Sequence, residues 1–209
     1  MAEYLLYGFG ESGNAYKPAL MLQLCRLDWQ VRPVDYFNGE TRGEAYRSEV
    51  NAMGEVPVLV HGHRKLTQSG VILDYLAGQT RKFGPKSEDE RLEIMRWILF
   101  DNHKLTSYIG TLRFLLQFAR TGDTPVTEFL AGRVASNLKI LDGHLDSRDF
   151  VLGKRPTIAD LSLCGYLFFD GEPGVTLDPY KNVRKWLDRI RALPGWKHPY
   201  ELMPRMFKG

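Results

Sequence analysis

The sequence predicts a mixed α/β domain followed by an all-α domain. Strand and helix signals alternate up to about residue 79, and from residue 88 onward the apolar residues recur with a helical period. The stretch between them contains glycine, proline and several charges but little apolar content, which is typical of a linker. We therefore expect a domain over residues 1–79, a linker over 80–87 and a helical domain over 88–209.

The first domain is expected to follow the order β-α-β-α-β-β-α. Pro33 lies inside the second expected strand and favours an edge position, because proline cannot donate a hydrogen bond to a central ladder. The first two strands should be parallel through a helical crossover, and the last two should be antiparallel through a tight turn. The expected strands are 4–9, 29–37, 56–60 and 64–67, and the expected helices follow 11–14, lie within 38–53 and begin at 68.

The second domain is expected to hold four helices. One of them starts at Thr157-Ile158-Ala159-Asp160, which fits a capping box: the side chains of Thr157 and Asp160 each accept from the backbone N–H of the other. We expect the loss of Asp160 to cost stability rather than chemistry. The helical patterns run from Glu88 to about Arg120, from Val126 to Leu145, from Ile158 to Phe169 and from Val183 to Leu193.

The composition argues against several classes of protein. The formal charge of +3 comes from 28 basic and 25 acidic residues scattered along the chain, so nucleic-acid or membrane-surface binding has no electrostatic support. The N-terminus lacks the pattern of a secretory signal, and no apolar run approaches about 18 residues. Two distant cysteines are too few for a disulfide framework or a structural zinc site. We expect a cytoplasmic protein with no metal, no nucleic-acid partner and no membrane span.

Four segments of the chain carry a family resemblance when they are taken in order and at their spacing. They are Leu6–Gly8 with Ser12–Lys17, Asn51–Leu59, Leu66–Leu76, and Phe150–Gly153 with Pro156–Leu161. Through them the chain resembles, over nearly its full length, the cytosolic glutathione transferases, in particular the bacterial type with a serine in the first turn. The resemblance implies a thioredoxin-like N-terminal domain that binds glutathione, a helical domain that contributes a hydrophobic substrate site, and a homodimer.

The resemblance places Ser12 beside the sulfur of glutathione. Ser12 precedes a helix, where free N–H groups and the positive end of the helix dipole favour an anion such as a thiolate. Serine titrates too high to act as a base, so its expected role is to donate a hydrogen bond to sulfur. Asn14 is a second candidate and Tyr7 a lesser one, because other members carry asparagine or tyrosine near the sulfur. The alternative is that Ser12 or Asn14 only caps the helix, and the two roles are compatible.

Two further segments are expected to hold the rest of glutathione. A proline entering a strand at Pro57 leaves the pairing groups of the preceding residue free for a ligand. By resemblance, Val56 pairs its backbone with the cysteinyl part of glutathione and Pro57 is cis, although sequence physics alone favours trans. Gln68 and Ser69 open a helix whose hydroxyl and N–H groups suit the γ-glutamyl carboxylate, with a simple helix cap as the alternative.

The long helix of the second domain carries the remaining candidates. Asp101 resembles the acidic residue that some members lend across the dimer to the amine of glutathione, and a solvated carboxylate on the helix face is an equally good interpretation. Phe9, from the first turn, is expected to line a hydrophobic cleft for the second substrate together with Tyr108 and Phe114.

The resemblance implies a glutathione transferase, which activates glutathione as a thiolate for attack on a small hydrophobic electrophile. An isomerase, a peroxidase or a disulfide reductase would use the same site. The match to the maleylacetoacetate isomerase group is partial, because Gly13 and Asn14 depart from the serine-rich turn of that group. A non-catalytic interaction module on the same fold is the third alternative.

Overall fold

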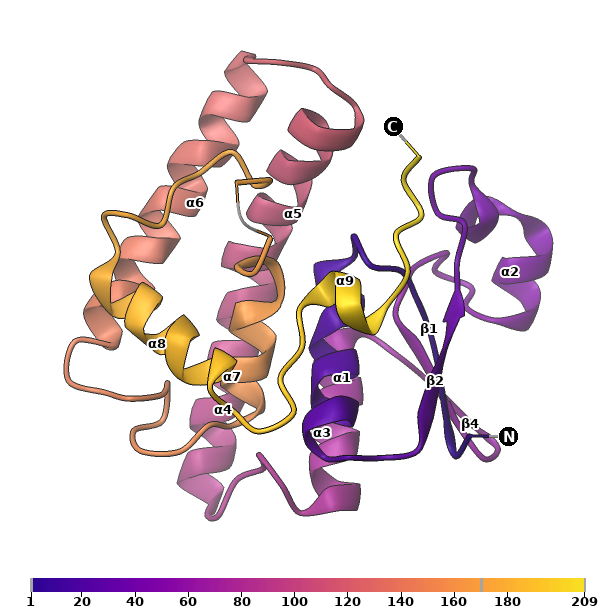
Figure 1. Cartoon of the computed structure of the whole chain (residues 1–209), viewed down its shortest axis with the longest axis horizontal. Coiled ribbons are helices and arrows are strands. Elements are labelled where there is room, and N and C mark those ends of the chain that lie inside the picture. The colour runs from indigo at the N-terminus through magenta and orange to yellow at the C-terminus, as the bar shows by residue number, and fades with distance from the viewer. Residues whose placement is uncertain (1, 170, 209) are drawn as a thin grey trace. The chain divides into compact units, whose positions relative to one another are not determined.

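The computed structural model describes residues 2–169 and 171–208, and its chain forms two compact units (Figure 1). The first unit contains the residues up to Lys82 together with those from Pro194 onward, and the second contains Phe83–Leu193. Residues 194–209 were expected in the helical domain. They belong to the first unit instead, because helix α9 (Pro199–Leu202) packs against α1 (Gly13–Leu24).

The first unit is built on a four-stranded sheet in the order β2-β1-β3-β4. β1 pairs in parallel with β2 and antiparallel with β3, and β3 pairs antiparallel with β4, which confirms the expected pairing. Pro33 ends the edge strand β2, where its missing donor costs no ladder hydrogen bond. The strands are β1 (Tyr4–Gly8), β2 (Trp29–Pro33), β3 (Val58–His61) and β4 (Arg64–Thr67).

Helices α1 and α3 pack against each other and against the sheet, and the core of the unit lies between these layers. Leu6, Leu20, Leu59 and Leu73, one from each of β1, α1, β3 and α3, are fully buried there. The irregular helix expected within 38–53 is a 3₁₀ turn followed by α2. The remaining bounds are Glu40–Arg42 for the 3₁₀ turn, Glu44–Glu49 for α2 and Ser69–Thr80 for α3.

The second unit is helical throughout its regular structure. The long helix expected from Glu88 is present, but its path includes two π-helical stretches, Asp101–Thr106 and Phe114–Phe118. Such widened turns are rare and are often found at functional sites. The other expected helices are present, although the third stops at Leu163 and continues only as a 3₁₀ turn. The helices are α4 (Glu88–Phe100), α5 (Ser107–Arg113), α6 (Pro125–His144), α7 (Ile158–Leu163) and α8 (Lys181–Arg191).

The predicted capping box at the start of α7 is present and has additional partners. Oδ2 of Asp160 accepts from the backbone N–H of Thr157 at 2.7 Å. Oδ1 accepts from the Val151 N–H at 2.8 Å and from the indole N–H of Trp186 at 2.9 Å. Burial raises the pKa of this fully buried carboxyl group, and the hydrogen bonds oppose that rise. Asp160 therefore joins α7 to α8 and to the segment before α7, which explains why its role is structural.

Candidate functional site

The turn between β1 and α1 carries Ser12, whose hydroxyl oxygen accepts from the Ala15 N–H at 3.1 Å and so caps α1. The backbone N–H of Ser12 donates to the Phe9 carbonyl, also at 3.1 Å, which closes the turn. A hydroxyl group has two acceptor lone pairs and one proton to donate. The cap uses a lone pair, so the hydroxyl proton remains for a second partner at the positive end of the helix.

Asn14 lies in the first turn of α1 and has an unmet hydrogen-bonding group. Its Oδ1 atom is buried and has no hydrogen-bond partner within residues 2–169 and 171–208. A buried acceptor without a partner costs about 1–3 kcal/mol, so a ligand that donates to Oδ1 would relieve a real penalty. Oδ1 of Asn14 could therefore accept a hydrogen bond from a donor group of a ligand.

Phe9 lies in a small aromatic core, which we call the Phe9 cluster and define as buried Phe9, Val34 and Tyr46. The ring of Phe9 is only 5% exposed. It stacks on Tyr36 at 5.3 Å and meets Phe37 edge-on at 5.7 Å between ring centroids. Phe9 thus offers a ligand little surface, in contrast to the expectation that it lines an open cleft. Tyr7, the lesser sulfur candidate, packs against the same cluster.

The peptide bond between Val56 and Pro57 is cis, as the resemblance implies. The ladder of β3 begins only at Val58, so Val56 lies before the paired part of the strand. The carbonyl of Glu55 accepts two hydrogen bonds of 3.0 Å, from the Tyr46 hydroxyl and from the Asn51 side-chain amide. Burial is the main cause that raises the pKa of Tyr46 to about 12, so its hydroxyl remains a donor at neutral pH. These two contacts fix the backbone just before Val56.

Gln68 immediately precedes α3 and has a φ of +65°, a conformation that non-glycine residues rarely adopt. Its amide nitrogen donates to Oε2 of Glu55 at 2.9 Å, which joins two segments expected to hold glutathione. Gln68 makes no side-chain cap bond, and Ser69 is buried as the first residue of the helix. The simple cap that the sequence left open as an alternative is therefore absent at Gln68.

Asp101 begins the first π-helical stretch and is fully buried. Its two oxygens accept from the hydroxyl groups of Thr106 at 2.8 Å and Ser162 at 2.6 Å. The interpretation of Asp101 as a solvated carboxylate on the helix face is wrong, because the side chain faces α7 within the helical unit. Its contact with the glutathione of a partner subunit stays a prediction.

The two aromatic candidates on the long helical path have different surroundings. Tyr108, on α5, is partly buried, and the guanidinium of Arg133 lies 5.3 Å from the centre of its ring. Phe114 starts the second π-helical stretch and is 40% exposed, so it offers an aromatic surface to solvent. Its ring centroid is 6.2 Å from that of Phe118.

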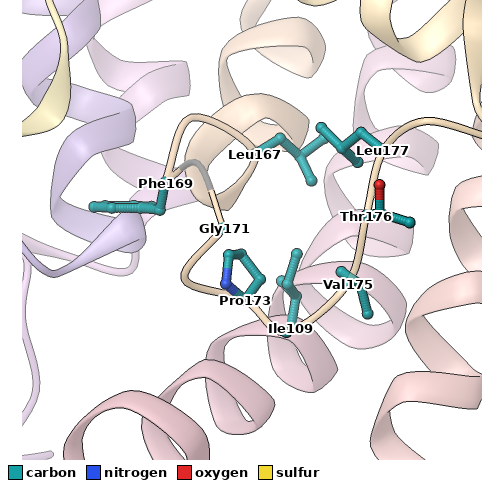
Figure 2. Close-up of a pocket in the computed structure, with 9 residues that line it drawn as sticks. Ile109, Leu167, Phe169, Gly171, Pro173, Val175, Thr176 and Leu177 are labelled. Atoms are coloured by element: carbon teal, nitrogen blue, oxygen red, sulfur yellow. The ribbon is translucent and has the colours of Figure 1, made fainter.

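The helical unit contains an apolar pocket of about 400 Å³, which the sequence did not reveal (Figure 2). The loop formed by residues 171–177 curves around this space, and Figure 2 shows Ile109 of α5 between Pro173 and Val175. The lining residues are Ile109, Leu167, Phe169, Gly171, Pro173, Gly174, Val175, Thr176 and Leu177. Gly171, Pro173 and Gly174 could have been recognised as a turn signal, but nothing in their spacing indicates a pocket.

Contacts of Arg113 hold this loop to the long helical path. Arg113, which is almost fully buried, pairs with Glu172 through a hydrogen bond of 3.0 Å between Nε and Oε2. Its guanidinium also lies 3.8 Å from the centre of the Phe169 ring. A side chain at Gly174, where φ is +70°, would collide with the Leu116 side chain. The loop therefore depends on glycine at this position and on the ion pair between Arg113 and Glu172.

Within the described residues, no group of three or more His, Cys, Asp or Glu side chains is arranged to hold a metal ion. Over the same part of the chain, no helix combines the length and apolar character needed to cross a bilayer.

Comparison with known proteins identifies the family. A model of the glutathione S-transferase N-terminal domain matches residues 2–78, and a model of the C-terminal domain matches residues 103–194. A solved structure of a possible glutathione S-transferase from Rhodopseudomonas palustris is 32% identical, covers 94% of this chain and 89% of its own, and superposes with a TM-score of 0.87. The chain belongs to the glutathione transferase family.

Two other members of the family are similar to this chain over nearly its full length. Maleylacetoacetate isomerase of Pseudomonas aeruginosa is 28% identical over 93% of this chain and 95% of its own length. A family member from Pseudomonas fluorescens, solved with two glutathione bound, has a TM-score of 0.84, covers 97% of this chain and 92% of its own, and is 22% identical, so it shows the shared fold.

Proposed function

We propose that this chain is a glutathione transferase, which binds glutathione and activates its thiol for attack on a small hydrophobic electrophile. The main support for the proposal is the hydrogen bonding of the Ser12 hydroxyl group. Its oxygen already accepts the N-cap bond from Ala15, so it can direct its proton toward a bound sulfur. A donor at the positive end of a helix favours the thiolate over the neutral thiol.

The choice of Ser12 over Asn14 as the sulfur partner follows from donor and acceptor character. A thiolate needs a donor, which the Ser12 hydroxyl supplies, whereas the unpartnered atom of Asn14 is an acceptor. We assign Asn14 to a donor group elsewhere on glutathione. A free thiol has a pKa of about 8.5, and each unit by which the site lowers that pKa corresponds to about 1.4 kcal/mol.

The remaining contacts with glutathione are assigned to the segments around Pro57 and α3. Val56 lies outside the β ladder, so its backbone groups are available to pair with the cysteinyl part of the tripeptide. Ser69, buried at the start of α3, is assigned to the γ-glutamyl carboxylate together with Gln68. The hydrogen bond between Gln68 and Glu55 joins the two segments to which these subsites are assigned.

The pocket in the helical unit supports an apolar second substrate. Among the described residues that line it, none has a charged side chain, and Thr176 supplies a hydroxyl group. Its volume of about 400 Å³ lies within the range of small-molecule sites. The exposed ring of Phe114 adds aromatic surface to the same unit.

The homodimer is supported by exposed apolar side chains on α4. Leu92, Met95 and Leu99 are spaced at i, i+3 and i+7, so they share one helix face, and Leu99 is 61% exposed. An apolar stripe of this kind is commonly covered by a partner. The two free cysteines are buried, which is compatible with the proposed cytoplasmic location.

Calorimetry with glutathione, followed by a conjugation assay, tests the proposed function. Binding together with saturable conjugation of an aryl chloride is the expected result. In that reaction the thiolate sulfur forms a bond to the ring carbon, and chloride leaves with the electrons of the broken carbon–chlorine bond. Binding without conjugation or any other glutathione-dependent turnover would favour the interaction module, and no binding would contradict both.

An isomerase is the second candidate, because the similarity to maleylacetoacetate isomerase extends over nearly both chains. In such a reaction glutathione adds reversibly and is released, so no thiol is consumed. Following thiol concentration during turnover therefore separates the two reactions. Steady thiol consumption with an aryl chloride, and no turnover of maleylacetoacetate, is the result that we expect.

A further inference from the structure

The C-terminal segment, which we define as residues 203–208, lies directly against the turn that carries Ser12. The backbone N–H of Gly10 donates to the Pro204 carbonyl at 2.7 Å. A side chain at Gly10 would meet the Met203 carbonyl oxygen at 2.8 Å and the Tyr200 ring at 2.9 Å, so only glycine permits this approach. The close contact therefore depends on the sequence of the turn itself.

Glu11 fastens the same segment through its carboxylate. This side chain is only 3% exposed, and both of its oxygens accept from the Met206 N–H at 3.0 Å. Oε1 also accepts from the Phe207 N–H at 3.0 Å. Hydrogen bonds from backbone N–H groups to a buried carboxylate are among the strong ones, and their loss leaves a charge without its donors. We call these hydrogen bonds of Glu11 to Met206 and Phe207 the Glu11 clamp. Because Glu11 and Ser12 are adjacent, the clamp lies next to the proposed sulfur site.

The side chains of the segment extend an aromatic surface over the turn. Met206 packs against the Phe9 cluster, and the centroid of the Phe207 ring is 4.9 Å from that of Phe37. Val56, which is assigned to the glutathione backbone, packs against the same cluster. One small core thus connects the C-terminal segment with two of the segments proposed to bind glutathione. Phe207 is only partly buried, whereas Phe9, within the cluster, is almost completely shielded from solvent.

We propose that Phe207 forms an aromatic wall beside Ser12 that selects flat aromatic electrophiles, and that Glu11 is the positioning residue that holds this wall in place. The inference rests on the proposed transferase function and names its substrate class. A planar aromatic electrophile would continue the series of rings formed by Phe37 and Phe207, because aromatic rings attract one another in stacked or edge-on contact. Phe207 thereby takes the role that the sequence had suggested for Phe9.

The test compares two electrophiles that both lose a halide to the thiolate. Chlorodinitrobenzene presents an aromatic ring, whereas iodoethane has none, and each forms one sulfur–carbon bond as its carbon–halogen bond breaks. Phe207→Leu keeps an apolar side chain but removes the ring. We expect it to lower the ratio of kcat/KM for the aromatic over the aliphatic probe by about five- to tenfold, as for the loss of one aromatic pair. The Kd for glutathione should change less than about twofold.

Glu11→Gln should lower the same ratio, because it weakens the clamp without touching Phe207 itself. Hydrogen exchange at the backbone amides of Met206 and Phe207 should become faster in this variant. Glu40→Gln is the matched control, since the carboxylate of Glu40 lies in the same unit but contacts the Asp35 N–H and the Arg32 side chain. Phe129→Leu controls for the loss of an exposed ring on α6.

The two variants test the role of Phe207 and the role of Glu11 independently. An unchanged substrate ratio in Phe207→Leu would overturn the aromatic wall. Unchanged exchange at the two amides in Glu11→Gln would overturn the clamp, and if that variant does not fold, a chain that stops after Arg205 gives the same comparison of substrates. A native chain that binds glutathione but conjugates neither probe would contradict the transferase function itself, whereas the exchange result still judges the clamp.

Discussion

The two units of this protein present their functional groups in opposite ways. In the first unit, polar groups of three short segments are held by individual hydrogen bonds, as between Gln68 and Glu55. In the second unit, the pocket is an apolar space between α5 and a loop that the ion pair of Arg113 with Glu172 helps to hold. Under the proposed function, glutathione is bound by polar groups held at fixed positions, whereas the apolar second substrate is accommodated by packing.

The largest effect, a loss of stability, is expected from Asp160→Ala. This variant tests whether the helical unit can be destabilised without loss of glutathione binding by the first unit. Removing this carboxylate leaves the buried donors of Thr157, Val151 and Trp186 without their partner. We expect unfolding in urea to lose about 3–5 kcal/mol of stability. Asp149→Ala, at a partly exposed carboxylate, is the control. A loss below about 1 kcal/mol would show that the network is dispensable.

Ser69→Ala tests whether a polar group of the first unit binds glutathione. The loss of a hydrogen bond to a charged carboxylate should weaken glutathione binding by about 1.5–3 kcal/mol, or roughly one to two decades in Kd. The KM for glutathione should rise more than kcat falls, because the contact is the same in the ground state and the transition state. An unaltered Kd in calorimetry, with circular dichroism showing a folded variant, would leave Ser69 only a structural role.

Val175→Phe fills the apolar pocket of the second unit and so tests whether this pocket binds the second substrate. The larger side chain would occupy space that we assign to the second substrate, and burial of one small apolar group is worth about 1–2 kcal/mol. We therefore expect KM for the electrophile to rise by about tenfold, with the glutathione Kd unchanged. A change of similar size in the glutathione Kd would contradict the assignment of this pocket to the second substrate alone.

The smallest effect concerns His144, whose ring nitrogen Nε2 donates to the Val151 carbonyl at 2.8 Å. Burial is the main cause that lowers the pKa of this ring, and the hydrogen bond opposes it. The folded pKa therefore lies below the unfolded value of about 6.5. Its contribution to stability is present above that value and is lost as pH falls through the folded pKa.

Thermal unfolding of the native chain should accordingly shift to lower temperature as pH is reduced from about 7 to about 5. His144→Gln retains a donor for the Val151 carbonyl but cannot take up a proton. It should reduce this pH dependence, and an equal dependence in both proteins would assign the effect to other groups.

Much of the fold followed from the sequence because local signals and packing agree. Pro33 predicted an edge strand, and Thr157 with Asp160 predicted a helix start, since each depends on a backbone group close in sequence. The placement of 194–209 could not be derived in this way. The contacts of Glu11 with Met206 and Phe207 join residues from opposite ends of the chain, and no short pattern encodes them.

The candidate site was predictable to a similar degree. The cis bond before Pro57 was expected only through the family resemblance, because physics alone favours trans. The buried surroundings of Phe9 and Asp101 were missed, since an apolar or acidic residue on a turn or helix reveals nothing of what covers it. Tyr46, which supports the backbone before Val56, carried no signal within its polar stretch.

The thiol pKa of bound glutathione shows whether Ser12 activates the thiol. Ser12→Ala removes both the helix cap and the proposed donor to sulfur, whereas Ser87→Ala removes only a cap, since Ser87 accepts from the Glu90 N–H at 3.1 Å at the start of α4. Ultraviolet titration of the thiolate in each complex should give a pKa about one unit or more higher in Ser12→Ala than in the native chain, and a native value in Ser87→Ala. An unchanged pKa in Ser12→Ala would contradict the assignment of Ser12 as the donor that activates the thiol.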